Sequence, residues 1–305
     1  MSQQTFDVIV IGEGVAGLTA AYALAKDGLK VATLEAQLFG GLVININELD
    51  PAPDERAVSG AEFAAELMQA NAELDVTSVQ EAVTALGNAG EINQAVTAGA
   101  IYGARHIIVA SGARLRKLGI PGEAEFEGRG VSQCADCDGP MYQGEDVVVA
   151  GGGDSALQEA LVLARFCRKV HLVHRGGSFR ARKHFVEQVN ANPKIATIWN
   201  ATVEQIAGSR MVETVCVKLG DGRIQEIPCA GVFVYIGLAP NSEFLPARIA
   251  RNDAGFVVTD DALQTTLPGV WAIGAVRSGY GGLLRDAAFE ARNVAERIVK
   301  RLGLG

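Results

Sequence analysis

A short motif that occurs twice limits the folds this chain can adopt. Residues 7–11 form an apolar run, DVIVI, followed by GEGVAG at residues 12–17 and by a helix-favouring stretch that stops near Gly28. The order predicts a strand, a tight turn and a helix, whose N-terminus would face a pyrophosphate across the glycines. Glu35, after a second apolar run, can accept hydrogen bonds from ribose hydroxyls. With all these parts in place, the motif is typical of a dinucleotide-binding α/β unit.

The second copy has a different residue at the position that corresponds to Glu35. Residues 146–150, DVVVA, lead into GGGDSA at residues 151–156, and the next strand-like run ends in His174 and Arg175. An acidic side chain there would repel the 2′-phosphate of NADP, whereas arginine can pair with it. The second copy therefore favours NADP. The alternative is that His174 and Arg175 only end an exposed strand.

The order of the two copies predicts the domain organisation. We expect an α/β protein with two Rossmann-like nucleotide-binding domains, each with a three-layer (ββα/α-β-α) arrangement, and with the second domain inserted into the first. Strand-like runs near residues 101–112 and 230–238 would leave and re-enter the first domain. We expect the first domain to contain residues 1–115 and 240–305, and the second domain to contain residues 116–239.

Composition and charge exclude several classes of function. The 305 residues have a formal net charge of -8, which argues against a nucleic-acid or anionic-membrane surface. The start of the chain has no basic segment before an apolar run, and no segment has the roughly 18 apolar residues needed to span a bilayer. We expect a cytoplasmic protein. Its 5 cysteines are too few and too scattered for a disulfide framework.

Cys134 and Cys137 form a CxxC pair, CADC, that could bind a metal, form a structural bridge or undergo redox cycling. A structural zinc site needs four ligands, and the other cysteines are single and scattered, so we expect no metal. A static bridge is uncommon in a cytosolic chain. Redox cycling is favoured, because CxxC lowers the pKa of one thiol and the second thiol resolves a mixed disulfide. Asp138 could carry protons to this pair or cap a turn.

The whole series of motifs resembles the low-molecular-weight thioredoxin reductase family over nearly the full chain. In order these motifs are GEGVAGL with Glu35, VASG with IPGE, CADCDG, GGGDSALQEAL, VHLVHR with FRA, IGLAPN and GVWAIG. CADCDGP is also similar to the flavoprotein reductase of alkyl hydroperoxide reductase systems. The resemblance implies an FAD-dependent enzyme that passes electrons from NADPH, via FAD and the Cys134–Cys137 dithiol, to a thioredoxin-like protein disulfide. It also implies a homodimer in which Cys137 faces the flavin and Cys134 opens the substrate disulfide.

The two turns and the resemblance together nominate the site residues. The catalytic candidates are Cys134, Cys137 and Asp138. The candidates for FAD binding are Gly12, Gly14, Val15, Ala16, Gly17, Glu35, Ala36, Gly40, Gly41, Ala110, Gly112, Gly274 and Ala275. The candidates for NADPH binding are Gly151, Gly153, Asp154, Ser155, Ala156, His174, Arg175 and Arg180.

The chain departs from the family at the phosphate-binding segment. Gly176 stands where the family has a second arginine after the histidine, while Arg175 and Arg180 remain. A hydrogen bond to a charged group contributes roughly 1.5–3 kcal/mol, so this loss would weaken NADPH binding about tenfold to a hundredfold.

Three further departures lie around the flavin. Ala275 replaces an aspartate that holds a ribityl hydroxyl, and Gly282–Leu283 replace an arginine–glutamine pair, for which Arg285 is a nearby substitute. Leu42 and the segment NELDPAP (47–53) replace a GGQ loop and the pattern after it. We expect these changes to replace polar flavin contacts with apolar or empty space, and so to alter the reduction potential or the donor.

These departures leave alternatives open. The chain could be a pyridine-nucleotide-independent relative that uses ferredoxin as its donor, although the intact second glycine turn and Arg175 argue against this. It could be a dithiol oxidase acting on a small molecule, although CADCDG is closer to the protein-disulfide reductases. It could also be a non-catalytic flavin-binding redox sensor, but a protein that had lost its catalytic function would not need paired thiols.

Overall fold

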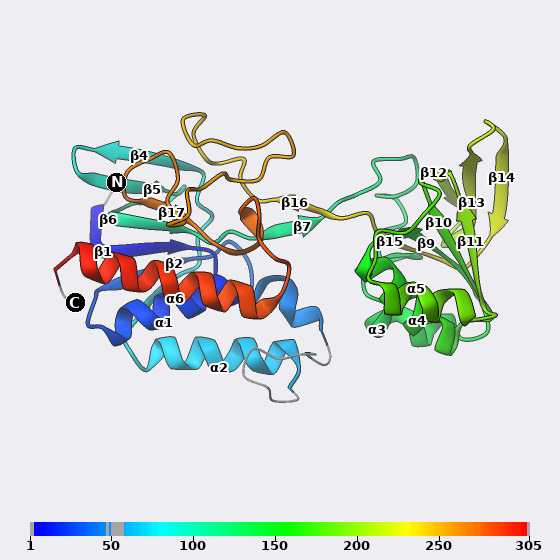
Figure 1. Cartoon of the computed structure of the whole chain (residues 1–305), viewed down its shortest axis with the longest axis horizontal. Helices are drawn as coiled ribbons and strands as arrows, with labels where there is room; N and C mark the ends of the chain where they lie inside the picture. The colour runs from blue at the N-terminus through cyan, green and yellow to red at the C-terminus, as the bar shows by residue number, and fades with distance from the viewer. Residues whose placement is uncertain (1–2, 47–48, 50–57, 304–305) are drawn as a thin grey trace. The chain divides into compact units, whose positions relative to one another are not determined.

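The computed structural model describes residues 3–46, 49 and 58–303, which form two compact units. The first unit contains Met1–Arg114 and Ala239–Gly305, and the second unit contains Leu115–Leu238. Each unit has its own sheet and helices, as Figure 1 shows, and its own hydrophobic cores. The predicted α/β fold, with two Rossmann-like units of which the second is inserted into the first, is confirmed.

The sheet of the first unit positions the first glycine turn. Its strands in the described residues run in the order β3-β2-β1-β6-β5-β4, and β17 also pairs with β6. Their bounds are β1 (Gln3–Ile11), β2 (Val31–Leu34), β3 (Thr77–Val79), β4 (Ala85–Ala89), β5 (Ile92–Val96), β6 (Ile101–Val109) and β17 (Val270–Ala272). In the parallel part of the sheet, Ile11 lies opposite Leu34 and Val109. These three strands therefore end at one edge, where the glycine turn begins.

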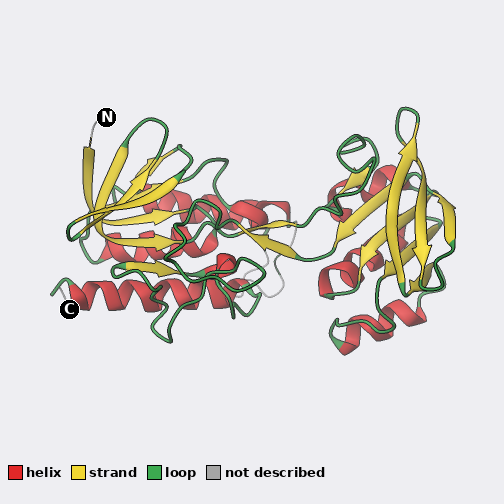
Figure 2. Ribbon diagram, turned by 90° about the horizontal axis from the view of Figure 1, so that it is seen from above, coloured by secondary structure: helices red, strands yellow, loops and turns green. Residues whose placement is uncertain are grey.

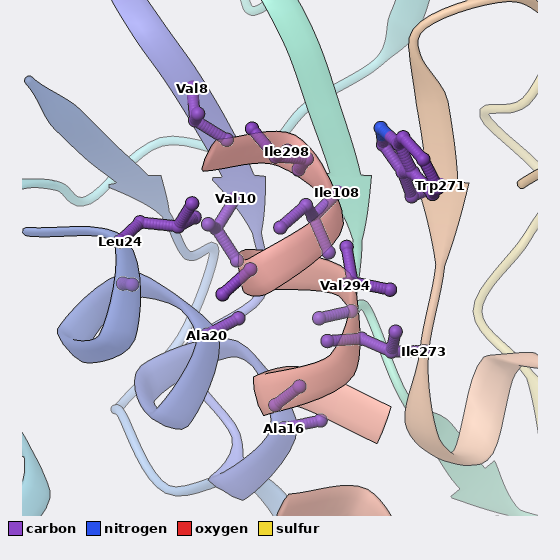
Figure 3. Packing of buried hydrophobic residues seen from close by; sticks show 14 of the residues in the cluster. Val8, Val10, Ala16, Ala20, Leu24, Ile108, Trp271, Ile273, Val294 and Ile298 are labelled. Carbon is purple, nitrogen blue, oxygen red and sulfur yellow. The ribbon is translucent and has the colours of Figure 1, made fainter. Parts of the chain in front are cut away.

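Helices cover one face of this sheet. They are α1 (Val15–Lys26), α2 (Gly60–Ala72) and α6 (Leu284–Arg301), with 3₁₀ turns η1 (Gly41–Asn45) and η3 (Gly274–Val276). In α6 the buried residues Ala287, Ala291, Val294 and Ile298 recur every three or four positions, so they form one stripe. Figure 3 shows Val294 and Ile298 packing with Ala20 and Leu24 of α1 over Val8, Val10 and Ile108 of the sheet. Packing in this apolar layer stabilises α1, the helix that follows the first glycine-rich turn.

The second unit repeats this arrangement on a smaller scale. Its parallel sheet has the order β11-β10-β9-β15-β8, and a separate antiparallel sheet has the order β12-β13-β14. The strands are β8 (Val131–Ser132), β9 (Asp146–Gly151), β10 (Lys169–His174), β11 (Ile195–Trp199), β12 (Ala201–Gly208), β13 (Val212–Leu219), β14 (Ile224–Pro228) and β15 (Gly231–Tyr235). The helices are α3 (Ala135–Asp138), α4 (Asp154–Phe166) and α5 (Lys183–Ala191), with the 3₁₀ turn η2 (Gly139–Tyr142).

Two cores hold the second unit together. One core lies between the parallel sheet and the antiparallel sheet, and the other lies between the parallel sheet and the helices α4 and α5. Figure 2 shows the strands and helices in their separate layers. Buried apolar residues fill β9 and β15, as expected for central strands with both faces covered.

Two short strands, β7 (Ala113–Leu115) and β16 (Leu238–Pro240), carry the chain between the units and pair with each other. Arg114 and Arg116 reinforce this pairing, because Arg114 Nη1 donates to Asn241 Oδ1 at 2.9 Å and Arg116 Nε donates to the Leu238 carbonyl oxygen at 2.7 Å. Within the part of the chain that the structure describes, no helix is long and apolar enough to cross a membrane.

Candidate active site

The first glycine turn joins β1 to α1, and its glycines serve different needs. A methyl group at Gly17 would lie 1.9 Å from the carbonyl oxygen of Gly12, and one at Gly12 would lie 2.3 Å from the carbonyl oxygen of Ala110. A methyl group at Gly14 would have only the carbonyl oxygen of Gly40 within reach, at 3.9 Å. Gly12 and Gly17 are therefore required for close packing, whereas Gly14 leaves open space beside the turn.

Glu35 is held in place by backbone groups. It follows β2, and its carboxylate oxygens accept hydrogen bonds from the N–H groups of Glu13 at 2.9 Å and Gln37 at 3.0 Å. Glu13 is itself buried, and its carboxylate accepts hydrogen bonds from the hydroxyls of Thr33 at 2.5 Å and Ser78 at 2.6 Å. The Glu35 carboxylate is thus oriented at the edge of the turn and retains lone pairs for further donors.

A pocket of about 570 Å³ opens beside this turn, within the first unit. The residues predicted for FAD that line it are Gly12, Gly14, Val15, Ala16, Glu35, Ala36, Gly40, Gly41, Ala110, Gly112, Gly274 and Ala275. Gly17 lies behind the turn, against Gly12. Open glycine backbone, a helix N-terminus and an oriented carboxylate are the donor and acceptor set that a dinucleotide such as FAD requires, so these residues fit it.

Apolar side chains form another part of the wall of this pocket. They are Leu42, Val83, Phe244, Ala275, Tyr280 and Leu284. Tyr280 is turned inward by its own chain, since its hydroxyl donates to the carbonyl oxygen of Leu283 at 2.8 Å. Burial, followed by the charges of Asp286 and Glu290, raises the pKa of Tyr280 to about 12. The substitutions at Leu42 and Ala275 therefore lie at the pocket itself.

The other departures from the family lie elsewhere. Gly282 and Leu283 are not among the described residues that line the pocket, where Tyr280 and Leu284 stand instead. Arg285 does not line it either, because its side chain is 67% exposed and lies 3.9 Å from a carboxylate oxygen of Asp286. The segment 47–53 lies outside the described residues except for Leu49, which is buried.

A buried ion pair fixes the wall that carries Gly274 and Ala275. Glu290 of α6 accepts a hydrogen bond from the N–H of Gly274 at 2.7 Å, and it pairs with the Arg277 guanidinium. Arg277 Nη1 donates in turn to the Ser278 carbonyl oxygen at 2.8 Å. The helix α6 thereby sets the position of a pocket wall that precedes it in sequence.

The second glycine turn joins β9 to α4. A methyl group at Gly151 would lie 2.4 Å from the carbonyl oxygen of Tyr235, whereas one at Gly153 would have no atom within 4 Å. Gly153 is therefore the open position of this turn, as Gly14 is in the first. Ala156 stands where the first turn has Gly17, and it is fully buried.

A pocket of about 490 Å³ lies at this turn, within the second unit. All the residues predicted for NADPH line it, namely Gly151, Gly153, Asp154, Ser155, Ala156, His174, Arg175 and Arg180. Arg182 is already paired with Asp154, with Nε donating to the carboxylate at 2.7 Å, whereas the described contacts of Arg175 and Arg180 include no ion pair. These two exposed guanidiniums are therefore available to an anion in the pocket.

His174 and Gly176 shape the same pocket. His174 is buried, and its Nε2 lies 3.0 Å from the carbonyl oxygen of Ser178. A methyl group at Gly176 would lie 3.1 Å from the same His174 nitrogen. An arginine at position 176 would therefore contact the histidine ring. Gly176 avoids this contact.

Cys134 and Cys137 form a disulfide at the start of α3, with their Cα atoms 5.3 Å apart. Cys134 is the N-cap residue and is half-buried, and its sulfur accepts a hydrogen bond from the N–H of Cys137 at 3.2 Å. Cys137 is exposed, and Asp138 is half-buried at the end of the same helix. The charge of Asp138 contributes, after burial, to raising the pKa of Tyr142.

Two of the remaining thiols are buried and have raised pKa values. Burial raises the pKa of Cys167 to about 11 and that of Cys229 to about 12, so both stay protonated at neutral pH. Cys216 is half-buried in β13. Among the described residues, no group of three or more His, Cys, Asp or Glu side chains could hold a metal ion.

Sequence reasoning missed two side chains beside the cysteine pair. Glu159 of α4 and Tyr235 at the end of β15 both contact the backbone N–H of Ala135, at 3.0 Å and 3.1 Å. The Tyr235 hydroxyl also donates to Glu159 at 3.1 Å. Nothing in the sequence marks these contacts, because they join residues that are 24, 76 and 100 positions apart.

The chain matches known proteins over nearly its whole length. The family model described as pyridine nucleotide-disulphide oxidoreductase matches residues 6–295. The chain is 38% identical over 275 residues to the thioredoxin reductase of Treponema pallidum, covering 90% of this chain and 89% of that protein. It is also 38% identical over 283 residues to the thioredoxin reductase of Listeria monocytogenes, covering 90% of this chain and 87% of the relative.

A solved structure gives the same result for the fold. The crystal structure of Lactococcus lactis thioredoxin reductase superposes with a TM-score of 0.90 at 34% identity, covering 97% of this chain and 98% of that one. The likeness in fold thus extends over nearly the whole of both chains.

Proposed function

Because this chain belongs to the pyridine nucleotide-disulphide oxidoreductase family, and within it to the thioredoxin reductases, we propose that it reduces the disulfide of a thioredoxin-like protein with electrons from NADPH. It is a flavin-dependent disulfide oxidoreductase. The observation that carries the proposal is the Cys134–Cys137 disulfide, which lies in the same unit as a pocket where Arg175 and Arg180 form no ion pair with another described residue. We further propose that the protein is cytoplasmic and acts as a homodimer.

The first unit is proposed to bind FAD. Gly14 leaves room for the pyrophosphate, the N-terminus of α1 faces it, and Glu35 accepts hydrogen bonds from ribose hydroxyls. When bound, FAD converts hydride transfer from a nicotinamide into the two-electron reduction of a disulfide. Leu42, Ala275 and Tyr280 give part of this pocket an apolar wall.

The second unit is proposed to bind NADPH. Gly153 leaves the matching space at the second turn, and Arg175 and Arg180 supply positive charge where an adenosine 2′-phosphate would lie. The residues of the turn hold the ligand through backbone N–H groups at the start of α4. The choice of NADPH over NADH thus rests on the two guanidiniums.

The cysteine pair is proposed to carry out thiol–disulfide exchange. The Cys134 thiolate attacks one sulfur of the substrate disulfide, which forms a mixed disulfide and releases a substrate thiolate. Cys137 then attacks the Cys134 sulfur, which restores the Cys134–Cys137 disulfide and releases the second substrate thiolate. Two electrons pass to the substrate, whose two sulfurs take up two protons, and Asp138 is positioned to relay a proton at this pair.

Anaerobic titration of the purified protein tests the donor. We expect a yellow protein whose flavin absorbance is bleached by NADPH, and Cys134→Ser or Cys137→Ser variants that keep the flavin but lose disulfide reduction. Turnover in either variant would rule out the dithiol relay. Protein without flavin absorbance after reconstitution would contradict the enzymatic proposal.

A ferredoxin-linked reductase is the second candidate, and the apolar wall of the first pocket favours it. Ala275 and Leu42 line the site where the family has polar groups, so the flavin environment differs from that of the NADPH-dependent members. Titration with reduced ferredoxin under the same conditions separates the two. If ferredoxin bleaches the flavin and NADPH does not, the donor assignment changes while the roles of the cysteine pair remain.

A further inference from the structure

The backbone that carries the cysteine pair is anchored by one carboxylate. Ala135, which is fully buried, directly follows Cys134 and begins α3. Its N–H group is shared between Glu159 Oε2 at 3.0 Å and the Tyr235 hydroxyl oxygen at 3.1 Å. The Tyr235 O–H donates to the same Glu159 oxygen at 3.1 Å, which closes a three-membered ring of hydrogen bonds. Glu159 therefore binds the turn both directly and through Tyr235.

The charged side chains in the segment that carries the pair, residues 131–145, are all acidic. Asp136 lies between the two cysteines and is exposed, and Asp138 follows the second one. No lysine, arginine or histidine occurs from Val131 to Glu145. A carboxylate close to a thiol disfavours the thiolate, whereas backbone N–H donors and cations favour it. Glu159 disfavours the thiolate for two reasons. It brings a carboxylate to the turn, and it takes up an N–H group next to Cys134 that could otherwise stabilise the thiolate.

We propose that Glu159 is a positioning residue for the Cys134–Cys137 pair. Glu159 fixes the turn through Ala135, and its negative charge opposes ionisation of Cys134. When the thiolate of a reduced cysteine pair is less stabilised, the pair donates its electrons more readily. This property suits a reductase. The inference rests on the proposed redox role of this pair. It assigns to α4 a task in addition to forming the second glycine turn.

Tyr235 connects Glu159 with the pocket of the second unit. It lines the pocket of the second unit, and its hydroxyl contacts Glu159. Desolvation raises the pKa of Glu159, and Asp136 adds to this, while the bonds from Ala135 and Tyr235 lower it. The groups that face Glu159 are thus Ala135, Tyr235 and Asp136, and the two hydrogen bonds are what keep its charged form in a half-buried position.

The first test measures the charge. In a Cys137→Ser background, Cys134 is the one thiol left of the pair, and its alkylation by iodoacetamide is followed from pH 5 to 9 by mass spectrometry. Glu159→Gln keeps an oxygen acceptor for Ala135 but removes the charge, so alkylation at pH 7 should be faster by roughly threefold to tenfold. Glu226→Gln, which removes the same charge from β14, should leave the rate unchanged. Equal rates with and without Glu159→Gln would overturn the proposal.

The second test measures the positioning in the oxidised protein. Glu159→Ala leaves the Ala135 N–H without its carboxylate, so amide hydrogen exchange in the peptide that contains α3 should be severalfold faster, and Glu159→Gln should restore slow exchange. Unchanged exchange in Glu159→Ala would overturn the positioning role. Neither test needs turnover or a nicotinamide. The results of both tests are therefore independent of the outcome of the donor titration.

Discussion

The two glycine turns have the same backbone plan, yet their surroundings differ in a way that supports our proposal of a different ligand for each. In the first turn a carboxylate, Glu35, is oriented by two backbone N–H groups, and apolar side chains close part of the pocket. In the second turn a buried histidine stands at the matching place and two exposed guanidiniums face the pocket. In both turns the glycines open the space, and we propose that the residues after the second strand select the ligand.

The largest effect is expected where the two turns differ in packing. Gly17→Ala places a methyl group 1.9 Å from the Gly12 carbonyl oxygen, so it should lower the free energy of unfolding of the first unit. Overpacking of this kind costs about 1–3 kcal/mol or more. We expect loss of bound FAD, measured by flavin absorbance, together with a lower Tm.

The second turn supplies the control, because Ala156 already occupies the corresponding position. Ala156→Gly should cost about 1 kcal/mol of helix stability and leave the flavin content unchanged. If Gly17→Ala retained its flavin, the first turn would not differ from the second in its need for glycine.

A smaller effect is expected from the charge difference between the turns. Arg175→Ala removes a charge-assisted hydrogen bond, and we expect the Kd for NADPH to rise about tenfold to a hundredfold, with NADH unaffected. Fluorescence titration of both nucleotides measures this. Arg223→Ala, which removes an exposed guanidinium paired with Asp221, serves as the matched control. Equal weakening of NADPH and NADH would remove the phosphate-pairing argument.

Adding a positive charge at the second turn should strengthen its binding of NADPH. Gly176→Arg adds a guanidinium beside Arg175, but its Cβ lies 3.1 Å from the His174 ring, so part of the gain is lost to repacking. We expect NADPH binding to tighten about threefold to tenfold. Gly176→Ala adds the same Cβ without charge, and it should show no gain in affinity. Tighter binding in both variants would mean that backbone stiffness, and not charge, is responsible.

The smallest effect concerns acid stability. Burial, followed by the charges of Arg301 and Arg105, lowers the pKa of His106 in the first unit. The folded state thus favours neutral histidine, and stability that is complete above the unfolded pKa of about 6.5 is lost as the pH falls towards the folded value.

Comparison of Tm at pH 7, 6 and 5 tests this effect. His106→Gln should show a smaller decline than the parent protein, and His184→Gln, at an exposed position, should decline as the parent does. An identical decline in His106→Gln and the parent would show that other groups dominate.

The fold was predictable because its signals are local. A strand, a glycine turn and a helix are encoded within about 30 residues, and the same pattern at residues 12–17 and 151–156 indicated two Rossmann-like units. The Cys134–Cys137 pair was visible for the same reason. The structure then places all but one of the predicted nucleotide-binding residues on the two pockets, the exception being Gly17.

The rest depends on contacts between distant residues. The ring formed by Ala135, Glu159 and Tyr235 joins residues from α3, α4 and β15, and nothing in the spacing of these residues predicts that they meet. The sequence also predicted only some of the departures from the family that lie at the first pocket. Tyr280 and Leu284 form the wall where Gly282 and Leu283 were expected, and no local pattern in the sequence marks this path of the loop before α6.

The burial of Cys167 and Cys229 has a consequence for an enzyme that works among oxidants. Peroxide reacts with thiolates, and these two sulfurs stay protonated beneath α4 and β15, with pKa values near 11 and 12. Oxidative attack on these two thiols is thereby disfavoured, whereas Cys134 and Cys137 already form a disulfide. Oxidation of this pair that stops at the Cys134–Cys137 disulfide only produces the oxidised form of the catalyst. The protein reduces that disulfide again in each catalytic cycle.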